Sequence, residues 1–196
     1  MHYTGQDIGG DIISHNRLSD VILKKSILVG TFGAIWGLAG VFLLLGSAVY
    51  RLSVVAASAF SHTLQPRHWA ALLIAVLFIA YAEGYRAFQQ RFSPRVAARA
   101  KYLRNHPRVL HVALAPLFCM GFFYATRRRK ITSISVTTGI VLLIVLVRLL
   151  PQPWRGIIDL SVVVGLGWGI VSLAFFSYQA FAKEDFNYPP DIPESQ

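Results

Sequence analysis

The sequence predicts an all-α integral membrane protein with four transmembrane helices and one further segment that is re-entrant or interfacial. Three observations lead to this fold class. Only 14% of the 196 residues are charged and 55% are hydrophobic, whereas a soluble domain carries roughly a quarter charged residues. Four long apolar runs are present. The basic residues between these runs are distributed unevenly, as membrane topology requires.

The four predicted spans are residues 27–50, 68–85, 134–150 and 156–182. The first run has 24 residues without a charge, and at about 1.5 Å per residue it is long enough to cross the hydrocarbon core. The charged residues of the other three runs lie near their ends, namely Glu83, Arg148 and Asp159.

A fifth apolar segment, residues 109–126, has basic residues on both sides. If it crosses, the protein has five spans and the two sides carry 12 and 7 Lys and Arg; if it does not, they carry 15 and 4. The second distribution obeys the positive-inside rule far better. Pro116 and Gly121 also weaken a continuous helix. We therefore expect a segment that enters the membrane and returns, or lies in its surface, and we keep five transmembrane helices as the alternative.

The predicted organisation is a cytoplasmic N-terminal segment (1–25), a polytopic membrane domain (26–182) and a flexible acidic, proline-rich tail (183–196). The first 25 residues hold six charges and no apolar core, so we expect an uncleaved signal anchor instead of a cleavable signal peptide. Both termini are expected in the cytoplasm. Because no organelle signal is visible, the expected location is the bacterial inner (plasma) membrane.

The membrane domain contains a strongly basic region, residues 86–130. From Gly84 to Ile158 there is no Asp or Glu, while the same stretch holds thirteen Lys and Arg. Such a region favours binding of anionic phospholipids, or of an acidic patch on another membrane protein subunit; the simpler interpretation is a positive-inside signal alone. No nucleic-acid motif is present, so no nucleic-acid partner is expected. The predicted lipid- or partner-binding residues are Arg86, Arg91, Arg95, Arg99, Lys101, Arg104, Arg108, Arg127, Arg128, Arg129 and Lys130.

Within this region, "FSPRVAARAKYLRNHP" predicts a short helix that begins at Ser93 and Pro94. Val96, Ala100 and Leu103 would share one narrow face. The basic side chains would surround the remainder and reach lipid phosphates from a helix lying in the headgroup region.

Two faces of small residues predict close helix packing, either within one bundle or with another subunit. Their members recur every three or four residues, so each set shares one side of a helix. The first set is Gly30, Gly33, Gly37 and Gly40, and the second is Ser161, Gly165 and Gly169.

The few polar residues within the apolar runs give little indication of a catalytic or transport site. Glu83 has Arg86 three residues later, which indicates either a local ion pair or a role in proton or substrate handling. Arg155 and Asp159 predict a second ion pair. The single cysteine, Cys119, is expected as buried packing.

No metal site and no cofactor is expected. One cysteine excludes a Cys-based cluster. In the four-span arrangement His68 starts at the outer surface and His111 at the inner one, which argues against a bis-histidine haem.

The stretch "YLRNHPRVLHVALAPLF" invites comparison with membrane methyltransferases of the isoprenylcysteine and phospholipid type, which carry an Arg-His-Pro stretch before a hydrophobic hairpin. Here Asn105 separates Arg104 from His106, and no acid follows Lys130 until Asp159. The chain is therefore not assigned to that family, and no catalytic residue is predicted.

The sequence favours a non-catalytic polytopic protein that acts as a subunit or assembly or scaffold factor of a membrane complex. It would contact anionic lipid or an acidic partner through its basic cytoplasmic face. One alternative is a transporter or channel component that uses the re-entrant segment and Glu83. The other is a methyltransferase-like, lipid-modifying enzyme that depends on Arg104 and His106.

Overall fold

The computed structural model describes residues 8–183 and 186–192, with side chains from Lys24 onward. The ends of the two predicted terminal segments, residues 1–7 and 193–196, lie outside this part. The described residues form helices and no strand. The elements are α1 (Ile8–Ala59), α2 (Pro66–Ile79), the π-helix η1 (Ala80–Phe92), α3 (Ser93–Asn105), α4 (Val109–Ala113), α5 (Ala115–Met120), α6 (Arg127–Arg148) and α7 (Trp154–Ala182).

Four helices in the described part of the chain are long and apolar enough to cross a membrane, which confirms the predicted membrane-helical class. They are Lys24–Ala59, Pro66–Asn105, Arg127–Arg148 and Trp154–Ala182. Each contains one of the four predicted apolar runs or most of it. The second is much longer than its run, because α2, η1 and α3 form one continuous helix of 40 residues.

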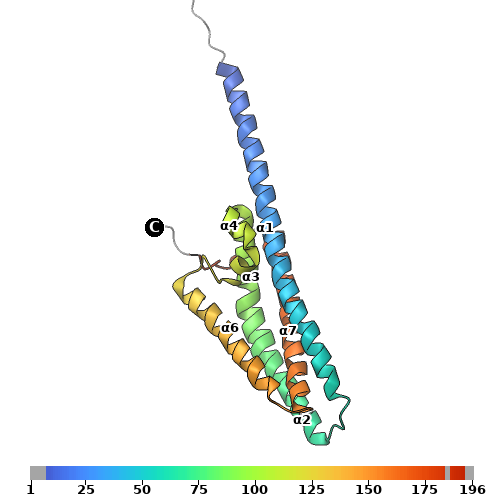
Figure 1. The fold of residues 1–196 in the computed structure, drawn as a ribbon. Helices are drawn as coiled ribbons and strands as arrows, with labels where there is room; N and C mark the ends of the chain where they lie inside the picture. The colour runs from blue at the N-terminus through green and yellow to red at the C-terminus, as the bar shows by residue number, and fades with distance from the viewer. Residues whose placement is uncertain (1–7, 184–185, 193–196) are drawn as a thin grey trace, which may run out of the picture.

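The chain runs up and down the bundle (Figure 1). Successive long helices are antiparallel, so α3 ends and α6 begins at the same end of the molecule. The C-terminal end of α7 lies at that end as well. The 106–126 segment connects α3 to α6 there as two short helices, α4 with 5 residues and α5 with 6. Neither is long enough to cross a bilayer.

The predicted short interfacial helix is wrong as an independent element. An α-helical segment does begin at Ser93, but the preceding Phe92 is itself helical. Pro94 has no N–H and its ring crowds the preceding turn. In the wider π-helix, the Ser93 N–H bonds to the Phe88 carbonyl, five residues back. The helix therefore passes through Pro94 without ending.

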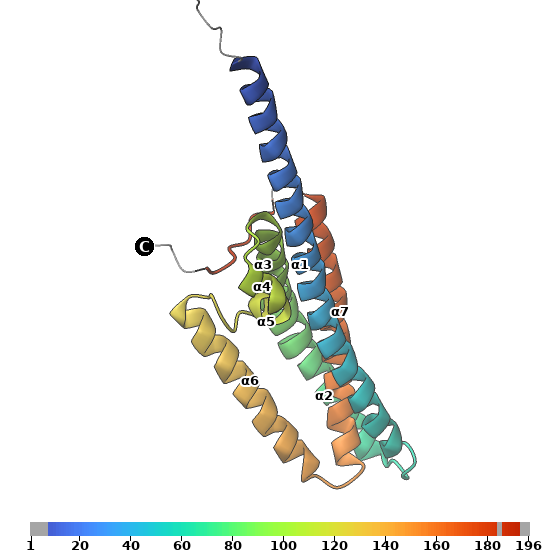
Figure 2. The same ribbon diagram turned by 45° about the horizontal axis from the view of Figure 1, so that its top comes forward.

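This continuous helix carries the buried face of α3 into the bundle, where it packs on α1 and α7. The core lies between α1, α3, α5 and α7, and includes Val41, Val96, Leu103, Phe118, Cys119 and Leu173. By contrast, α6 diverges from the bundle (Figure 2). Its apolar side chains stay exposed along the helix, and lipid would cover such a surface.

The structure places both small-residue faces inside this one chain. On α1, a Cβ at Gly30 would meet the Arg104 carbonyl, and a Cβ at Gly33 would lie 2.9 Å from the Val112 side chain. At Gly37 and Gly40 the neighbours would be Cys119 and Pro116 of α5. The first face therefore receives the end of α3 and the 106–126 segment.

The second face packs on the π-helix. A Cβ at Gly165 would lie 3.3 Å from Glu83 Oε2, and one at Gly169 would lie 2.7 Å from the Phe88 ring. Ser161 is fully buried and its hydroxyl donates to the Ile157 carbonyl at 2.8 Å. Neither face requires another subunit to explain its small residues.

Replacing Gly40 with leucine should displace α5 from α1, because the new side chain would meet the rigid Pro116 ring. Cys119 is fully buried behind the same face. We expect its thiol to react with a maleimide about ten times faster in Gly40→Leu than in the wild type, in detergent solution.

Gly46→Leu is the matched control, because nothing lies within 4 Å of a Cβ at Gly46 of the same helix. It should leave the labelling rate of Cys119 unchanged. Equal rates in the two variants would contradict the packing of α5 on the glycine face.

Candidate functional site

The 106–126 segment lies against the bundle with one buried side and one exposed side. His111, Ala115, Phe118 and Cys119 face inward, while apolar side chains point outward. The exposed ones are Val109, Leu110, Leu114 and Leu117, of which Val109 is 87% exposed. Gly121 then turns the chain with a φ of 83°, a left-handed conformation that glycine adopts without strain.

Arg99 of α3 is the polar centre of this end of the bundle. It is 1% exposed, and all of its hydrogen bonds go to backbone carbonyls. Nε donates to Phe118 at 2.6 Å, and Nη2 donates to Phe123 and Tyr124 at 3.0 Å. The guanidinium also stacks over the Phe118 ring, 4.3 Å from its centroid.

The same arginine holds part of the C-terminal tail. Its Nη1 donates to the Pro190 carbonyl at 2.9 Å and to the Asp191 carbonyl at 3.5 Å. These five contacts match the five N–H donors of a guanidinium. The prediction that Arg99 lies on the exposed side of an interfacial helix is wrong, since its donors are occupied by protein.

Residues 186–192 of the tail have no regular secondary structure, but they lie on the bundle. The Thr126 N–H donates to the Asp191 carbonyl at 3.1 Å, and the Tyr188 ring meets Phe176 of α7 edge to face. Lys101 Nζ donates to the Lys183 carbonyl at 2.9 Å. The sequence did not predict this packing role for the tail.

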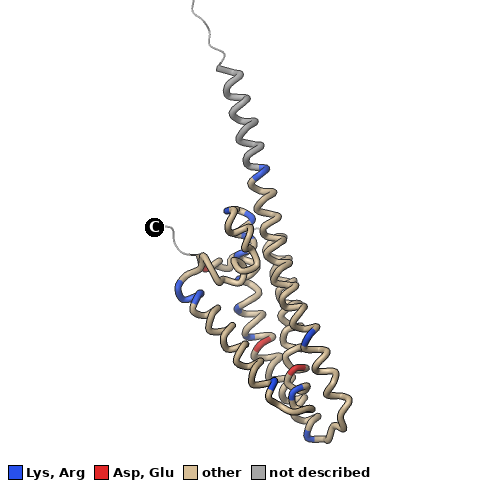
Figure 3. The backbone as a smooth tube through the Cα atoms, in the orientation of Figure 1, with Lys and Arg blue, Asp and Glu red and all other residues tan. Residues whose placement is uncertain are grey.

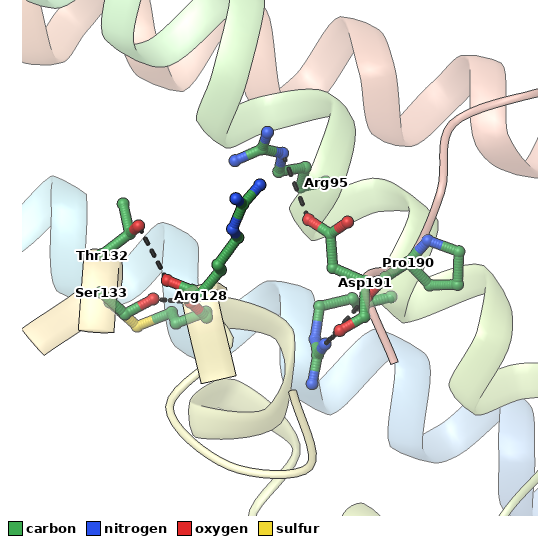
Figure 4. Close-up of polar contacts among 8 residues, drawn as sticks. Arg95, Arg128, Thr132, Ser133, Pro190 and Asp191 are labelled. Atoms are coloured by element: carbon green, nitrogen blue, oxygen red, sulfur yellow. Dashed lines mark hydrogen bonds and ion pairs between the residues drawn. The ribbon is translucent and has the colours of Figure 1, made fainter. Parts of the chain in front are cut away.

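Arginines of α3 and of the start of α6 lie near Asp191 of the tail, and Figure 4 shows Arg95 paired with its carboxylate. Arg95 Nε lies 3.5 Å from Asp191 Oδ2. Arg128 extends from the first turn of α6 toward Arg95 in this view. Arg129 is close enough to Arg95 to be repelled and to Asp191 to be attracted. We call Arg95, Arg99, Arg128, Arg129 and Asp191 the junction cluster.

The eleven predicted lipid- or partner-binding residues therefore divide by exposure. Arg99 and Arg129 are buried. Arg95, Lys101 and Arg104 are half-buried, and Arg104 stacks over the Phe181 ring of α7. The exposed members are Arg86, Arg91, Arg108, Arg127, Arg128 and Lys130.

Two titratable groups of the 106–126 segment are kept neutral by their surroundings. Burial lowers the pKa of His111, and the positive charges of Arg108 and Arg99 lower it further. The His111 ring packs against Phe118 and Tyr124, with centroids at 4.8 and 4.5 Å. Burial raises the pKa of the Cys119 thiol to about 12, partly offset by Arg99. A thiol in that state is a poor nucleophile.

Glu83 lies on η1 against Gly165 of α7. The local ion pair expected with Arg86 is not formed, and Glu83 makes no hydrogen bond or ion pair with the described residues. The predicted pair of Arg155 and Asp159 is present, with Nε 3.7 Å from Oδ2. His68 is in the first turn of α2 and His111 is in α4, and these helices lie toward opposite ends of the bundle (Figure 1), so the two side chains cannot share a haem.

In the part of the chain that the structure describes, no group of three His, Cys, Asp or Glu residues could hold a metal ion. His106 stacks on Tyr102 and is exposed. No protein-family model matches the chain, and no curated protein and no solved structure matches it either. The geometry of the site itself therefore carries the functional argument.

Sequence reasoning missed the burial of Arg99 and Arg129 and the role of Asp191. The sequence did contain a signal for the burial of Arg99. Its neighbours Val96, Ala97, Ala98 and Ala100 are small apolar residues, which are typical of a packed helix face and not of a solvated one. No comparable signal marked Arg129 within the run of four basic residues, since its burial depends on the turn at Gly121.

Replacing Arg99 with glutamine should destabilise the fold by about 3–5 kcal/mol, because five carbonyl contacts lose a charged donor inside the protein. We expect the thermal unfolding midpoint in detergent to fall by about 10 °C. Arg91→Gln removes an exposed charge from the same long helix and should leave the midpoint unchanged. Similar midpoints for the two variants would show that Arg99 does not hold the segments together.

Proposed function

We propose that the protein is a non-catalytic, multi-pass subunit or assembly factor of a membrane complex, and that its basic cytoplasmic face binds anionic phospholipid. The observation that carries this proposal is the gathering of basic residues at one end of the bundle. Arg104 and Arg108 flank the end of α3, and Arg127 to Lys130 form the first turn of α6 at the same end.

The distribution of basic residues along the bundle supports one orientation of the protein in the membrane. Figure 3 shows basic residues at both ends, and fewer at the end where α2 begins. That end carries Arg51, Arg67, Arg148 and Arg155. The positive-inside rule then assigns the end with the 106–126 segment, and both termini, to the cytoplasm. A bacterial inner membrane is the location we propose.

The 106–126 segment supports a re-entrant or interfacial placement in this orientation. Its outward side is apolar, which suits contact with acyl chains. Its irregular backbone is covered by α1 and by Arg99, which is the condition under which such backbone is tolerated near lipid.

Single cysteines in a Cys119→Ala background test this topology. Asn105→Cys and Arg127→Cys place exposed thiols on either side of the segment, and Ser61→Cys reports the opposite end. An impermeant thiol reagent added to intact bacteria should label only Ser61→Cys, whereas lysed cells should label all three. Labelling of Arg127→Cys in intact cells, with Asn105→Cys protected, would establish a fifth span and split the basic face.

Lipid analysis of the purified protein tests the function. Each basic residue near an anionic surface contributes roughly 1 kcal/mol. We therefore expect anionic phospholipid to be enriched over bulk membrane around the wild type. Combined Arg108→Gln, Arg127→Gln and Lys130→Gln should reduce the enrichment.

The matched control is the combined change of Arg51, Arg67 and Arg148 to Gln, three exposed basic residues toward the other end. This variant should keep the enrichment. A wild-type protein isolated in mild detergent with neither enriched anionic lipid nor a co-purifying protein would overturn the proposal.

The second candidate is a transporter or channel component, favoured by one observation. Glu83 lies within a predicted span, on a π-helix, without a partner among the described residues. Membrane-embedded acids and π-helices both occur often at functional sites. A five-span topology in the cysteine experiment would favour this candidate over lipid binding.

A further inference from the structure

The positive charges in the first turn of α6 are unfavourable for the helix to which they belong. Thr126 precedes the helix without a side-chain cap, and four consecutive basic residues follow. A helix N-terminus is the positive end of the helix dipole, and cationic side chains there are unfavourable. Lys130 makes the first intrahelical bond, to the Thr126 carbonyl. The N–H groups of the three preceding arginines find no acceptor among the described residues.

Arg129 is the second, independent observation. Only 9% of this residue is exposed, and its Nε is buried with no hydrogen-bond partner. The side chain packs against Gly121, where a Cβ would lie 3.1 Å from Nε. No hydrogen bond or ion pair to a described residue satisfies it. A buried Nε–H without an acceptor is unfavourable, and Asp191 offsets the charge of Arg129 only in part, so a further anion nearby would stabilise this side chain.

The protein's own carboxylate covers only part of this charge. Asp191 is the one described acid in the junction cluster, and it pairs with Arg95 at 3.5 Å. The donors of Arg99 are occupied by carbonyl oxygens, and Asp191 also attracts its charge. Asp191 is thus shared among Arg95, Arg99 and Arg129, and the cluster keeps a net positive charge beside the unpaired N–H groups of the first turn of α6.

The chemistry of these groups selects phosphate. Guanidinium forks match the spacing of phosphate oxygens and bond them in pairs. The N–H groups of a helix N-terminus bind the same kind of anion. The net positive charge of the cluster favours a headgroup that carries a net negative charge over a zwitterionic one.

The surroundings identify the source of the phosphate as a lipid. Directly beyond the first turn, α6 exposes Ile131, Ile134 and Val136. In the 106–126 segment, Leu114 between α4 and α5 and Leu117 of α5 are exposed. A phosphate held in the junction cluster would thus lie beside apolar surfaces that suit the acyl chains attached to it.

We propose that Arg95, Arg128 and Arg129, together with the first turn of α6, bind the phosphate of one anionic phospholipid, with Asp191 as the internal counter-ion that this phosphate replaces. This inference rests on the proposed lipid-binding function and assigns it to one site. The bound lipid would join α6, which otherwise diverges from the bundle, to α3.

Native mass spectrometry of the full-length protein, titrated with a short-chain phosphatidylglycerol, tests the site. We expect one tightly bound lipid in the wild type. Arg129→Gln should weaken its binding by about tenfold or more, because a charge-assisted contact inside the protein is lost. Arg127→Gln, in the same turn but exposed, should change the affinity by less than about twofold.

Asp191→Asn provides a variant of opposite sign. Asp191 has a φ of 48°, and asparagine tolerates this conformation, so the tail should stay docked. Removing the competing carboxylate should strengthen lipid binding about threefold or more. This variant also tests the site if Arg129→Gln fails to fold.

The outcomes separate the two proposals. Preference for phosphatidylglycerol over phosphatidylcholine in the wild type, unchanged by both Arg129→Gln and Asp191→Asn, would overturn this site and leave the basic face standing. No preference in the wild type would overturn both. Displacement of the lipid by millimolar inorganic phosphate alone, at equal affinity, would overturn the lipid assignment, because acyl chains would then contribute nothing.

Discussion

A single buried guanidinium determines how the end of the bundle that carries the 106–126 segment is built. The chain between α3 and α6 must reverse direction with few regular hydrogen bonds, so its carbonyls need donors from elsewhere. Arg99 supplies them to Phe118, Phe123 and Tyr124, and also bonds Pro190 and Asp191. One side chain thereby connects α3, the 106–126 segment and the tail. The charge is tolerated because oriented carbonyl dipoles replace its hydration.

The glycine face of α1 makes this arrangement sterically possible. Arg99 reaches the Phe118 carbonyl because α5 packs on both α1 and α3, and the close approach of α5 to α1 requires that α1 present no side chains at Gly37 and Gly40. The glycine face of α1 and the hydrogen bond from Arg99 therefore both fix the position of α5. Its position determines where Gly121 turns and where the first turn of α6 begins. The junction cluster is thus a consequence of packing decided almost ninety residues earlier in the chain.

Sequence periodicity and charge predicted the membrane class, the four apolar runs and the two small-residue faces, because these depend on local patterns. The continuous helix from Pro66 to Asn105 was not predicted, since Ser93 and Pro94 carry the usual signals of a helix start. The π-helix overrides them by shifting the hydrogen-bond register before Pro94. The partners of Arg99 lie 19 to 92 residues away, and no local pattern reports contacts of that range.

Within the run of four basic residues at the start of α6, burial separates the exposed side chains from one that needs a specific partner. Arg127 and Lys130 are exposed, so water or lipid headgroups can solvate their charges without a built site. Arg129 is different, because the turn at Gly121 withdraws it from solvent without providing an acceptor. Orientation alone would be served equally well by an exposed arginine at this position. A nearby anion would offset the cost of burying it, and the apolar flank of α6 makes a lipid phosphate the anion that this surface accommodates best.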